Sequence, residues 1–221
     1  MCTEEIPAAS VGGITCISHD GVSGNIFAVG SANGLVRVMD RRLDARSGVV
    51  ANWREHSPHR VCNVFMRPGQ MEVVSASSNG DVKYWDLRHR EPVFTLTDTH
   101  PDSALEYMAA HESAPVVLTA SSAAVRLWNR RGNPIGLVQP AAAQPNGGAS
   151  AYVRTWYGAK THSAAHVTAA TIHQYLPVAL MVADDGRVSS IQPRPSARPQ
   201  SVAPPAGPPT LASSRASSML G

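Results

Sequence analysis

The chain has 221 residues, of which 43% are hydrophobic and 16% are charged. This length can bury a core, the low charged fraction excludes a coiled coil, and the longest apolar run, 177–183, is too short for a membrane span of about 20 residues. The net charge of +3 comes from the three arginines of residues 193–221, so residues 1–192 are neutral and are not expected to bind nucleic acid or a membrane surface. An acidic N-terminal segment and only three cysteines argue against a secreted, disulfide-rich protein, and the sequence predicts a cytoplasmic one.

The chain contains an internal repeat with a period in the low to middle forties. Residues 31–42 align with residues 77–88, with Ser, Asn, Gly, Val, Asp and Arg in matching places. A third copy begins at Val125 and a weaker fourth at Asp185. This period, with a Trp-Asp-like ending, is typical of the WD repeats that form β-propeller blades.

Strands and tight turns are expected inside each repeat. The first strand of each unit is expected at 14–17, 61–65, 104–108 and 167–172. The second strand is expected at 26–29, 72–76, 116–120 and 178–182. Asn33-Gly34, Asn79-Gly80 and Asp185-Gly186 follow three of the second strands. Such dipeptides favour hairpins because they tolerate positive φ.

The sequence therefore predicts an all-β, WD-repeat β-propeller with about four blades, as the C-terminal part of a larger, seven-bladed propeller. The propeller portion is placed at 1–192, with blade-like units at 10–43, 56–96, 100–136 and 163–192. Residues 137–162 interrupt the period and are expected to be a loop insertion, and Trp53 is expected in a connector between blades. Residues 193–221 are rich in Pro, Ser, Ala and Arg, which predicts a disordered tail.

One group of side chains could carry chemistry. His56, Ser75 and a nearby acid would suit a nucleophilic triad, but the position of the acid holds Asn79, and no nucleophile elbow surrounds any serine. The same residue types form the internal hydrogen-bond network of WD repeats. We therefore assign a structural role to the following residues and predict neither a catalytic site nor a cofactor: His56, Ser75, Asn79, Trp85, Trp128 and Asp185.

The sequence also contains side chains that could bind a metal or a protein partner. His56, His59 and Cys62 offer only three of the four ligands that zinc prefers, and His162 with His166 would share a face only on a helix, so no metal site is predicted. The arginine pairs at 41–42 and 130–131 close two blades near acidic residues, which favours salt-bridged blade ends. The candidate partner-binding loop contains Tyr152, Trp156 and Tyr157, since exposed aromatic residues often dominate protein interfaces.

Residues 30–43, 53–56 and 79–86, with Asp-Arg-Arg-Leu at 40–43 and Trp-Arg-Glu-His at 53–56, resemble successive parts of the C-terminal WD-repeat domain of the raptor family. The resemblance implies a non-catalytic scaffold of TOR complex 1 that helps present substrates to the TOR kinase in nutrient and growth signalling. It also implies TOR complex subunits as partners and recruitment to the lysosome or vacuole surface. The alternatives are an unrelated WD-repeat adaptor in ubiquitin ligation or trafficking and, remotely, a Ser/His hydrolase.

Overall fold

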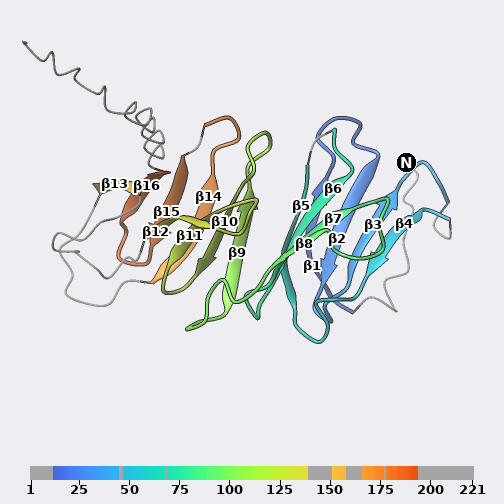
Figure 1. Cartoon of the computed structure of the whole chain (residues 1–221), viewed down its shortest axis with the longest axis horizontal. Helices are drawn as coiled ribbons and strands as arrows, with labels where there is room; N and C mark the ends of the chain where they lie inside the picture. Colours follow the sequence, from blue (N-terminus) through green and yellow to red (C-terminus); the bar gives the residue numbers. More distant parts are fainter. Residues whose placement is uncertain are drawn as a thin grey trace, which may run out of the picture.

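The computed structural model contains four antiparallel sheets of four strands each, which stand side by side in a row (Figure 1). It describes residues 12–44, 47–67, 69–138, 151–157, 166–176 and 178–193, and for 151–157 only the backbone. The expected all-β fold with four blade-like sheets is confirmed. The tail expected at 193–221 lies, beyond Pro193, outside the described residues. Within the described part there is no helix with the length and hydrophobicity to cross a membrane.

The sheets are blades 1 to 4. Blade 1 contains β1 (Ile14–His19), β2 (Ile26–Ser31), β3 (Val36–Asp40) and β4 (Val49–Trp53). Blade 2 contains β5 (Val61–Met66), β6 (Glu72–Ser77), β7 (Val82–Asp86) and β8 (Phe94–Leu96). Blade 3 contains β9 (Leu105–Ala110), β10 (Val116–Ser121), β11 (Val125–Asn129) and β12 (Pro134–Val138). Blade 4 contains β13 (Ala151–Tyr157), β14 (Val167–Ile172), β15 (Ala179–Ala183) and β16 (Val188–Pro193).

Glycine forms the predicted turn between the second and third strands of blades 1 and 2. Gly34 and Gly80 have φ of +82° and +93°, a region that other residues rarely adopt. A Cβ atom at Gly34 would also lie 2.4 Å from the backbone nitrogen of Ser57. The turn glycine of blade 1 is therefore required both by its own backbone and by the loop that leads to blade 2.

Blade 4 is built in a different order from the other three. Its strands lie in the order β13-β16-β15-β14, so the strand that comes first in the sequence takes the outermost place, beside β16. Residues 137–162, expected as a loop, thus include the end of β12 and all of β13. The aromatic and β-branched residues of 152–157 favour a strand, and pairing with β16 gives that strand its partner.

The core lies between the blades. Strands β1, β5, β9 and β14 contact one another in succession along the row, and three buried apolar clusters fill the spaces between adjacent sheets. Trp53 belongs to the cluster between blades 1 and 2, where its side chain is only 3% exposed. The expectation that Trp53 lies in a connector is wrong, because β4 extends to Trp53 and pairs it with Val36 of β3.

Candidate interaction surface

Among the described residues, one side of the propeller collects two turns from each of blades 1 to 3 and one turn from blade 4. Strand direction alternates within a blade, so the turn after the first strand and the turn after the third strand open on the same side. The β9–β10 and β14–β15 turns emerge together at the upper edge of Figure 1. We call this side the turn face; it comprises 20–25, 41–48, 67–71, 87–93, 111–115, 130–133 and 173–178, all described except 45, 46, 68 and 177. The opposite face comprises 32–35, 54–60, 78–81, 97–104, 122–124 and 184–187.

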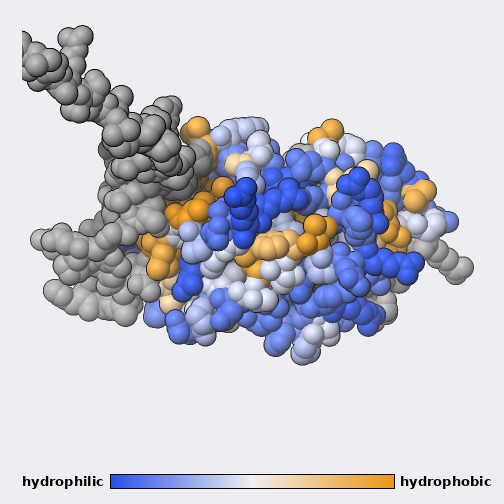
Figure 2. Space-filling model, in the orientation of Figure 1, coloured by the Kyte–Doolittle hydropathy of each residue, from blue (hydrophilic) through white to orange (hydrophobic). Residues whose placement is uncertain are grey.

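The turn face carries exposed apolar side chains. Its large apolar residues with exposures between 48% and 72% are Val22, Leu43, Met71, Val93, Tyr175 and Leu176. Among the described residues of the opposite face, no large apolar side chain is exposed. Figure 2 shows hydrophobic side chains at the upper edge, among hydrophilic ones. Exposed apolar residues gathered on one side of a soluble domain indicate an interaction surface.

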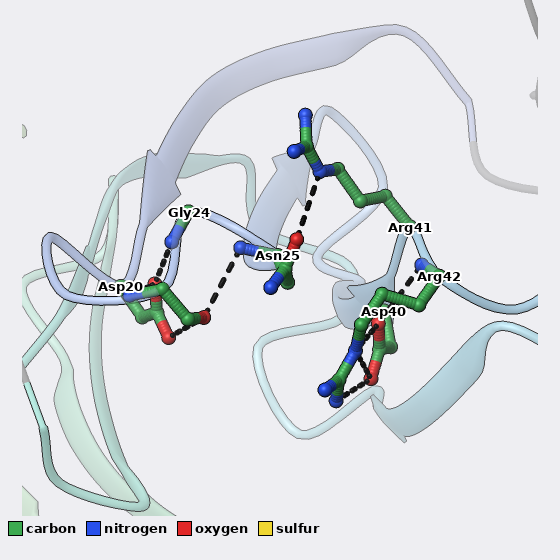
Figure 3. Close-up of polar contacts among 7 residues, drawn as sticks. Asp20, Gly24, Asn25, Asp40, Arg41 and Arg42 are labelled. Atoms are coloured by element: carbon green, nitrogen blue, oxygen red, sulfur yellow. Dashed lines mark hydrogen bonds and ion pairs between the residues drawn. The ribbon is translucent and has the colours of Figure 1, made fainter.

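Polar contacts hold the two turns of blade 1 in place (Figure 3). The Asp20 carboxylate accepts a hydrogen bond from the Gly24 backbone nitrogen at 2.7 Å, which closes the first turn. The Arg41 Nε donates to the Asn25 Oδ1 at 3.1 Å and joins the third-strand turn to the first-strand turn. Arg42 forms an ion pair with Asp40, 2.6 Å between Nη2 and Oδ2, as expected for a salt-bridged blade end.

A second set of contacts joins the turns of blades 2, 3 and 4. The buried Arg67 places its Nε 3.0 Å from the Glu72 Oε1, and Arg130 of blade 3 pairs with the other oxygen of Glu72. The Arg67 Nη1 also donates to the backbone oxygen of Glu112 at 3.4 Å. The Glu112 side chain in turn accepts a hydrogen bond from Gln174 of blade 4 at 2.7 Å. These contacts hold the turns of the turn face in place before a partner binds. Binding therefore costs little conformational entropy in these turns.

The suspected nucleophilic group is a buried hydrogen-bond lock. The His56 Nε2 lies 2.7 Å from the Ser75 Oγ, and the Trp85 Nε1 donates to the same oxygen at 2.7 Å. Burial lowers the pKa of His56 to about 3, so the ring is neutral near pH 7. The His56 Nδ1, where a triad would place its acid, has no hydrogen-bond partner among the described residues. These two hydrogen bonds join the loop before β5 to strands β6 and β7 of blade 2.

Two residues assigned to this network lie elsewhere. Asn79 accepts a hydrogen bond from the Ser77 Oγ at 2.6 Å within the β6–β7 turn. Asp185 sits in the β15–β16 turn, where its carboxylate lies 2.9 Å from the Arg187 Nε. Both stabilise hairpins and neither contacts the buried histidine lock.

Blade 3 contains a second copy of the lock that the sequence reasoning missed. The His100 Nε2 lies 3.0 Å from the Thr119 Oγ1, which accepts a hydrogen bond from the Trp128 Nε1 at 2.7 Å. Burial lowers the pKa of His100 to about 4. The signal was available, because His100 follows His56 at the repeat spacing and threonine supplies the same hydroxyl as Ser75.

The side chains rejected as zinc ligands from the sequence form no metal-binding group among the described residues. No group of three or more possible ligands occurs within the described ranges. Cys62 donates its thiol to the backbone oxygen of Ala76 at 3.2 Å, and burial raises its pKa to about 12, so the thiol form is favoured. His162 lies outside the described residues.

The candidate partner-binding residues lie in a strand, not in a loop. Tyr152 pairs with Gln192 and Tyr157 with Val188 in the β13–β16 ladder, and Trp156 falls at an irregularity between Thr155 and Tyr157. The side chains of all three aromatic residues lie outside what the structure describes.

Comparison with known proteins identifies relatives of this propeller. A family model described as the nucleolar protein 10-like, N-terminal domain matches residues 2–153. The chain is 35% identical over 136 residues to "Target of rapamycin complex 1 subunit mip1" of Schizosaccharomyces pombe, and 34% identical over 142 residues to "Target of rapamycin complex 1 subunit KOG1" of Saccharomyces cerevisiae. These alignments cover 61% and 58% of this chain but only 10% and 9% of the relatives. The fold also matches the crystal structure of Chaetomium thermophilum Raptor, with a TM-score of 0.72 and 26% identity over 88% of this chain and 17% of that one.

Proposed function

The chain belongs to the β-propeller family described as nucleolar protein 10-like, N-terminal domain, its WD-repeat region is homologous to that of raptor, and on this basis we propose that it is a non-catalytic scaffold of the TOR complex 1 type. The observation that carries the proposal is the similarity to two subunits named for target of rapamycin complex 1. In that role the propeller helps present substrates to the TOR kinase in nutrient and growth signalling. The expected location is the cytoplasm, with recruitment to the lysosome or vacuole surface.

The turn face supports a role in binding protein. It offers exposed apolar side chains on turns that are held by Arg41, Arg67 and Glu72. The buried hydroxyl–histidine locks of blades 2 and 3 start from the opposite face, and among the described residues no acid contacts the second ring nitrogen of either histidine, as a hydrolase would need. An apolar contact with paired charges around it favours a protein partner over a small anion or nucleic acid. We propose the turn face as the first binding surface. The aromatic residues Tyr152, Trp156 and Tyr157 are a second candidate.

Affinity purification tests this function. The full chain, tagged and expressed in cells, is expected to co-purify with the TOR kinase subunit. The association should survive a rise from about 0.15 M to about 0.4 M salt, because the propeller is electrically neutral and salt mainly screens exposed charges. Two variants tell which surface contributes to binding. One combines Trp156→Ser and Tyr157→Ser, and the other combines Val22→Ser, Met71→Ser and Val93→Ser on the turn face.

The recovered proteins decide between the candidate assemblies. Kinase peptides at both salt concentrations would support the TOR complex 1 role. Recovery of ubiquitin-ligase, coat or ribosome-assembly subunits with no kinase peptides would move the assignment to another WD-repeat adaptor. Labelling of Ser75 by an activity-based serine probe would support the hydrolase instead.

A further inference from the structure

Two turns of the turn face share a sequence pattern. His-x-x-x-Pro-Val occurs at residues 111–116 and again at residues 173–178. The first stretch follows β9 and the second follows β14, and these strands occupy equivalent places in blades 3 and 4. In both turns the backbone nitrogen of the histidine donates to the backbone oxygen of the valine, at 3.0 Å for His111 and 2.8 Å for His173. The two turns are therefore closed in the same way.

The ring of His111 holds the turn of blade 3 from inside. Its Nδ1 accepts hydrogen bonds from the backbone nitrogens of Ser113 and Ala114, at 3.1 Å and 2.9 Å. A ring nitrogen accepts only while it carries no hydrogen, so this ring is neutral and its hydrogen is on Nε2. His111 is only 3% exposed. A proton added at Nδ1 would turn an acceptor into a donor and bury a charge, and both changes oppose the closed turn.

The ring of His173 positions exposed side chains of blade 4 in the same way. Its Nδ1 accepts hydrogen bonds from the backbone nitrogens of Tyr175 and Leu176, both at 3.1 Å. The imidazole also lies edge-on to the Tyr175 ring, with the ring centroids 6.2 Å apart. Tyr175 and Leu176 are 72% and 54% exposed and belong to the exposed apolar residues of the turn face. The apolar surface of this turn therefore depends on a neutral histidine.

The equivalent turn of blade 1 uses a carboxylate instead. The Asp20 Oδ1 accepts hydrogen bonds from the backbone nitrogens of Ser23 and Gly24, at 3.1 Å and 2.7 Å. Carboxyl groups ordinarily gain a proton near about pH 4, whereas histidine ordinarily gains its second proton between about pH 5 and pH 8. A fall in pH across the histidine range therefore acts on the turns of blades 3 and 4 and leaves the turn of blade 1 in place.

Contacts between blades tie the two histidine turns together. Gln174 of blade 4 donates to the Glu112 carboxylate at 2.7 Å, and Arg67 of blade 2 donates to the backbone oxygen of Ala114 at 3.3 Å. The charged and titratable groups around the two turns are arginine, glutamate and tyrosine side chains: Arg67, Glu72, Arg130, Glu112 and Tyr175. These residue types ordinarily titrate outside the range from about pH 5.5 to about pH 7.5. A change of the two turns within this range therefore belongs to the histidines.

We propose that protons regulate the part of the turn face formed by residues 111–115 and 173–178. Neutral His111 and His173 hold these turns in their binding form, and protonation of the two rings releases them. The proposal rests on the proposed role of the turn face as a binding surface. Because the released segment includes Tyr175 and Leu176, a protein partner that contacts these side chains binds less tightly in acid. The fold itself persists, since the β-sheets and the turn of blade 1 do not depend on these two rings.

Backbone amide NMR of the monomeric fraction of the full chain tests the proton response without any partner. The pH is lowered from about 7.5 to about 5.5, which spans the ordinary titration of histidine. We expect the amide signals of the four residues that donate to the rings to shift together along a histidine titration curve; these residues are Ser113, Ala114, Tyr175 and Leu176. The amide signals of Ser23 and Gly24, which donate to Asp20, are the internal control and should stay in place.

Affinity purification at the same two pH values tests the effect on binding. The His111→Asp, His173→Asp variant replaces each ring by a carboxylate, which can accept from the backbone two residues on, as in an Asx-turn. The matched control is His59→Asp, at an exposed histidine of the opposite face. We expect the wild type and the control to recover about threefold less TOR kinase, or lower still, at about pH 5.5 than at about pH 7.5. The double variant should recover the same amount at both. His173→Asp alone serves if the double variant does not fold, as judged by circular dichroism.

The two readouts separate this proposal from the proposed function. Amide signals of the two histidine turns that stay fixed across the titration would overturn the proton response. An equal loss of kinase in acid for the double variant and for the control would show that His111 and His173 do not regulate binding, and would overturn it as well. Absence of the kinase at both pH values would contradict the proposed function instead, and the amide titration would still decide whether the turns respond to protons.

Discussion

Trp53 at the end of β4 stacks on Trp85 of β7, with ring centroids 4.6 Å apart and ring planes at 15°. The stack joins the outermost strand of blade 1 to the third strand of blade 2. The Trp85 indole also donates to Ser75, which contacts His56. Trp85 therefore takes part both in the contact between blades 1 and 2 and in the buried hydrogen-bond lock of blade 2.

Truncation of this stack tests the energetic role of Trp53. Both rings are almost fully buried, so Trp53→Ala and Trp85→Ala should each lower the free energy of unfolding by about 3–5 kcal/mol in urea denaturation. The double variant should show a coupling of about 0.5–1.5 kcal/mol, as expected for an aromatic pair. Strictly additive losses, or a loss at Trp53 below about 1 kcal/mol, would contradict the stack.

The buried His56 makes stability depend on pH. Its pKa is about 3 in the folded chain, whereas an ordinary histidine titrates near 6.5. Acidification therefore protonates the unfolded chain first, and stability that is complete above about pH 6.5 declines as the pH falls toward the folded pKa. Relative to His56→Gln, the wild type should lose about 1.4 kcal/mol more per pH unit between about pH 6 and pH 4. Parallel stability curves for the two proteins would show that His56 does not carry this effect.

The Glu72 carboxylate should matter far more than the carboxylate of Asp86. Glu72→Gln leaves the buried Arg67 guanidinium without its counter-charge, and we expect a loss of about 3–5 kcal/mol in thermal or urea unfolding. Asp86→Asn removes an ion pair to a well-exposed Arg88 and serves as the control, for which no measurable change is expected. Similar decreases in unfolding free energy for the two variants would contradict the conclusion that the ion pairs of Glu72 stabilise the contact between blades 2 and 3.

Ile14 and Ile17 on β1 are 55% and 67% exposed among the described residues, and this apolar edge of blade 1 should bind a hydrophobic dye. We expect the wild-type chain to enhance the fluorescence of such a dye and to elute partly as aggregate, because apolar blade edges invite association. Ile14→Ser with Ile17→Ser should reduce both effects, whereas a Val49→Ser, Val50→Ser control on β4 should reduce them less. A monodisperse wild-type monomer without dye binding would argue that the edge is covered.

The repeat made most of the strand positions predictable. Each hairpin with Asn-Gly or Asp-Gly could be placed from its dipeptide, and Gly34, Gly80 and Gly186 have the positive φ that such turns require. The lock of blade 2 was visible because His56 and Ser75 match the residue types of a WD repeat. The lock of blade 3 was missed because Thr119 replaces serine.

The features that escaped prediction depend on contacts between distant segments. The place of β13 follows from its pairing with β16, and the local sequence shows only that a strand can form there. The Glu72–Arg130 pair joins residues from two blades, and the burial of Trp53 depends on Trp85 of the next blade. The turn face likewise emerges only when the turns of the blades are brought to one side, since no single turn holds more than two of its exposed large apolar residues.

Quantitative affinity purification of a turn-face variant tests the central claim most directly. The variant combines Val22→Ser, Met71→Ser and Val93→Ser, and its control combines His59→Ser, Arg60→Ser and Asp102→Ser on the opposite face, where all three residues are exposed. Both should match the wild type in melting temperature. The account predicts that the turn-face variant recovers at least tenfold less TOR kinase than the wild type, while the control recovers the same amount. Equal recovery by all three proteins, or loss in the control alone, would contradict the assignment of the turn face as the binding surface.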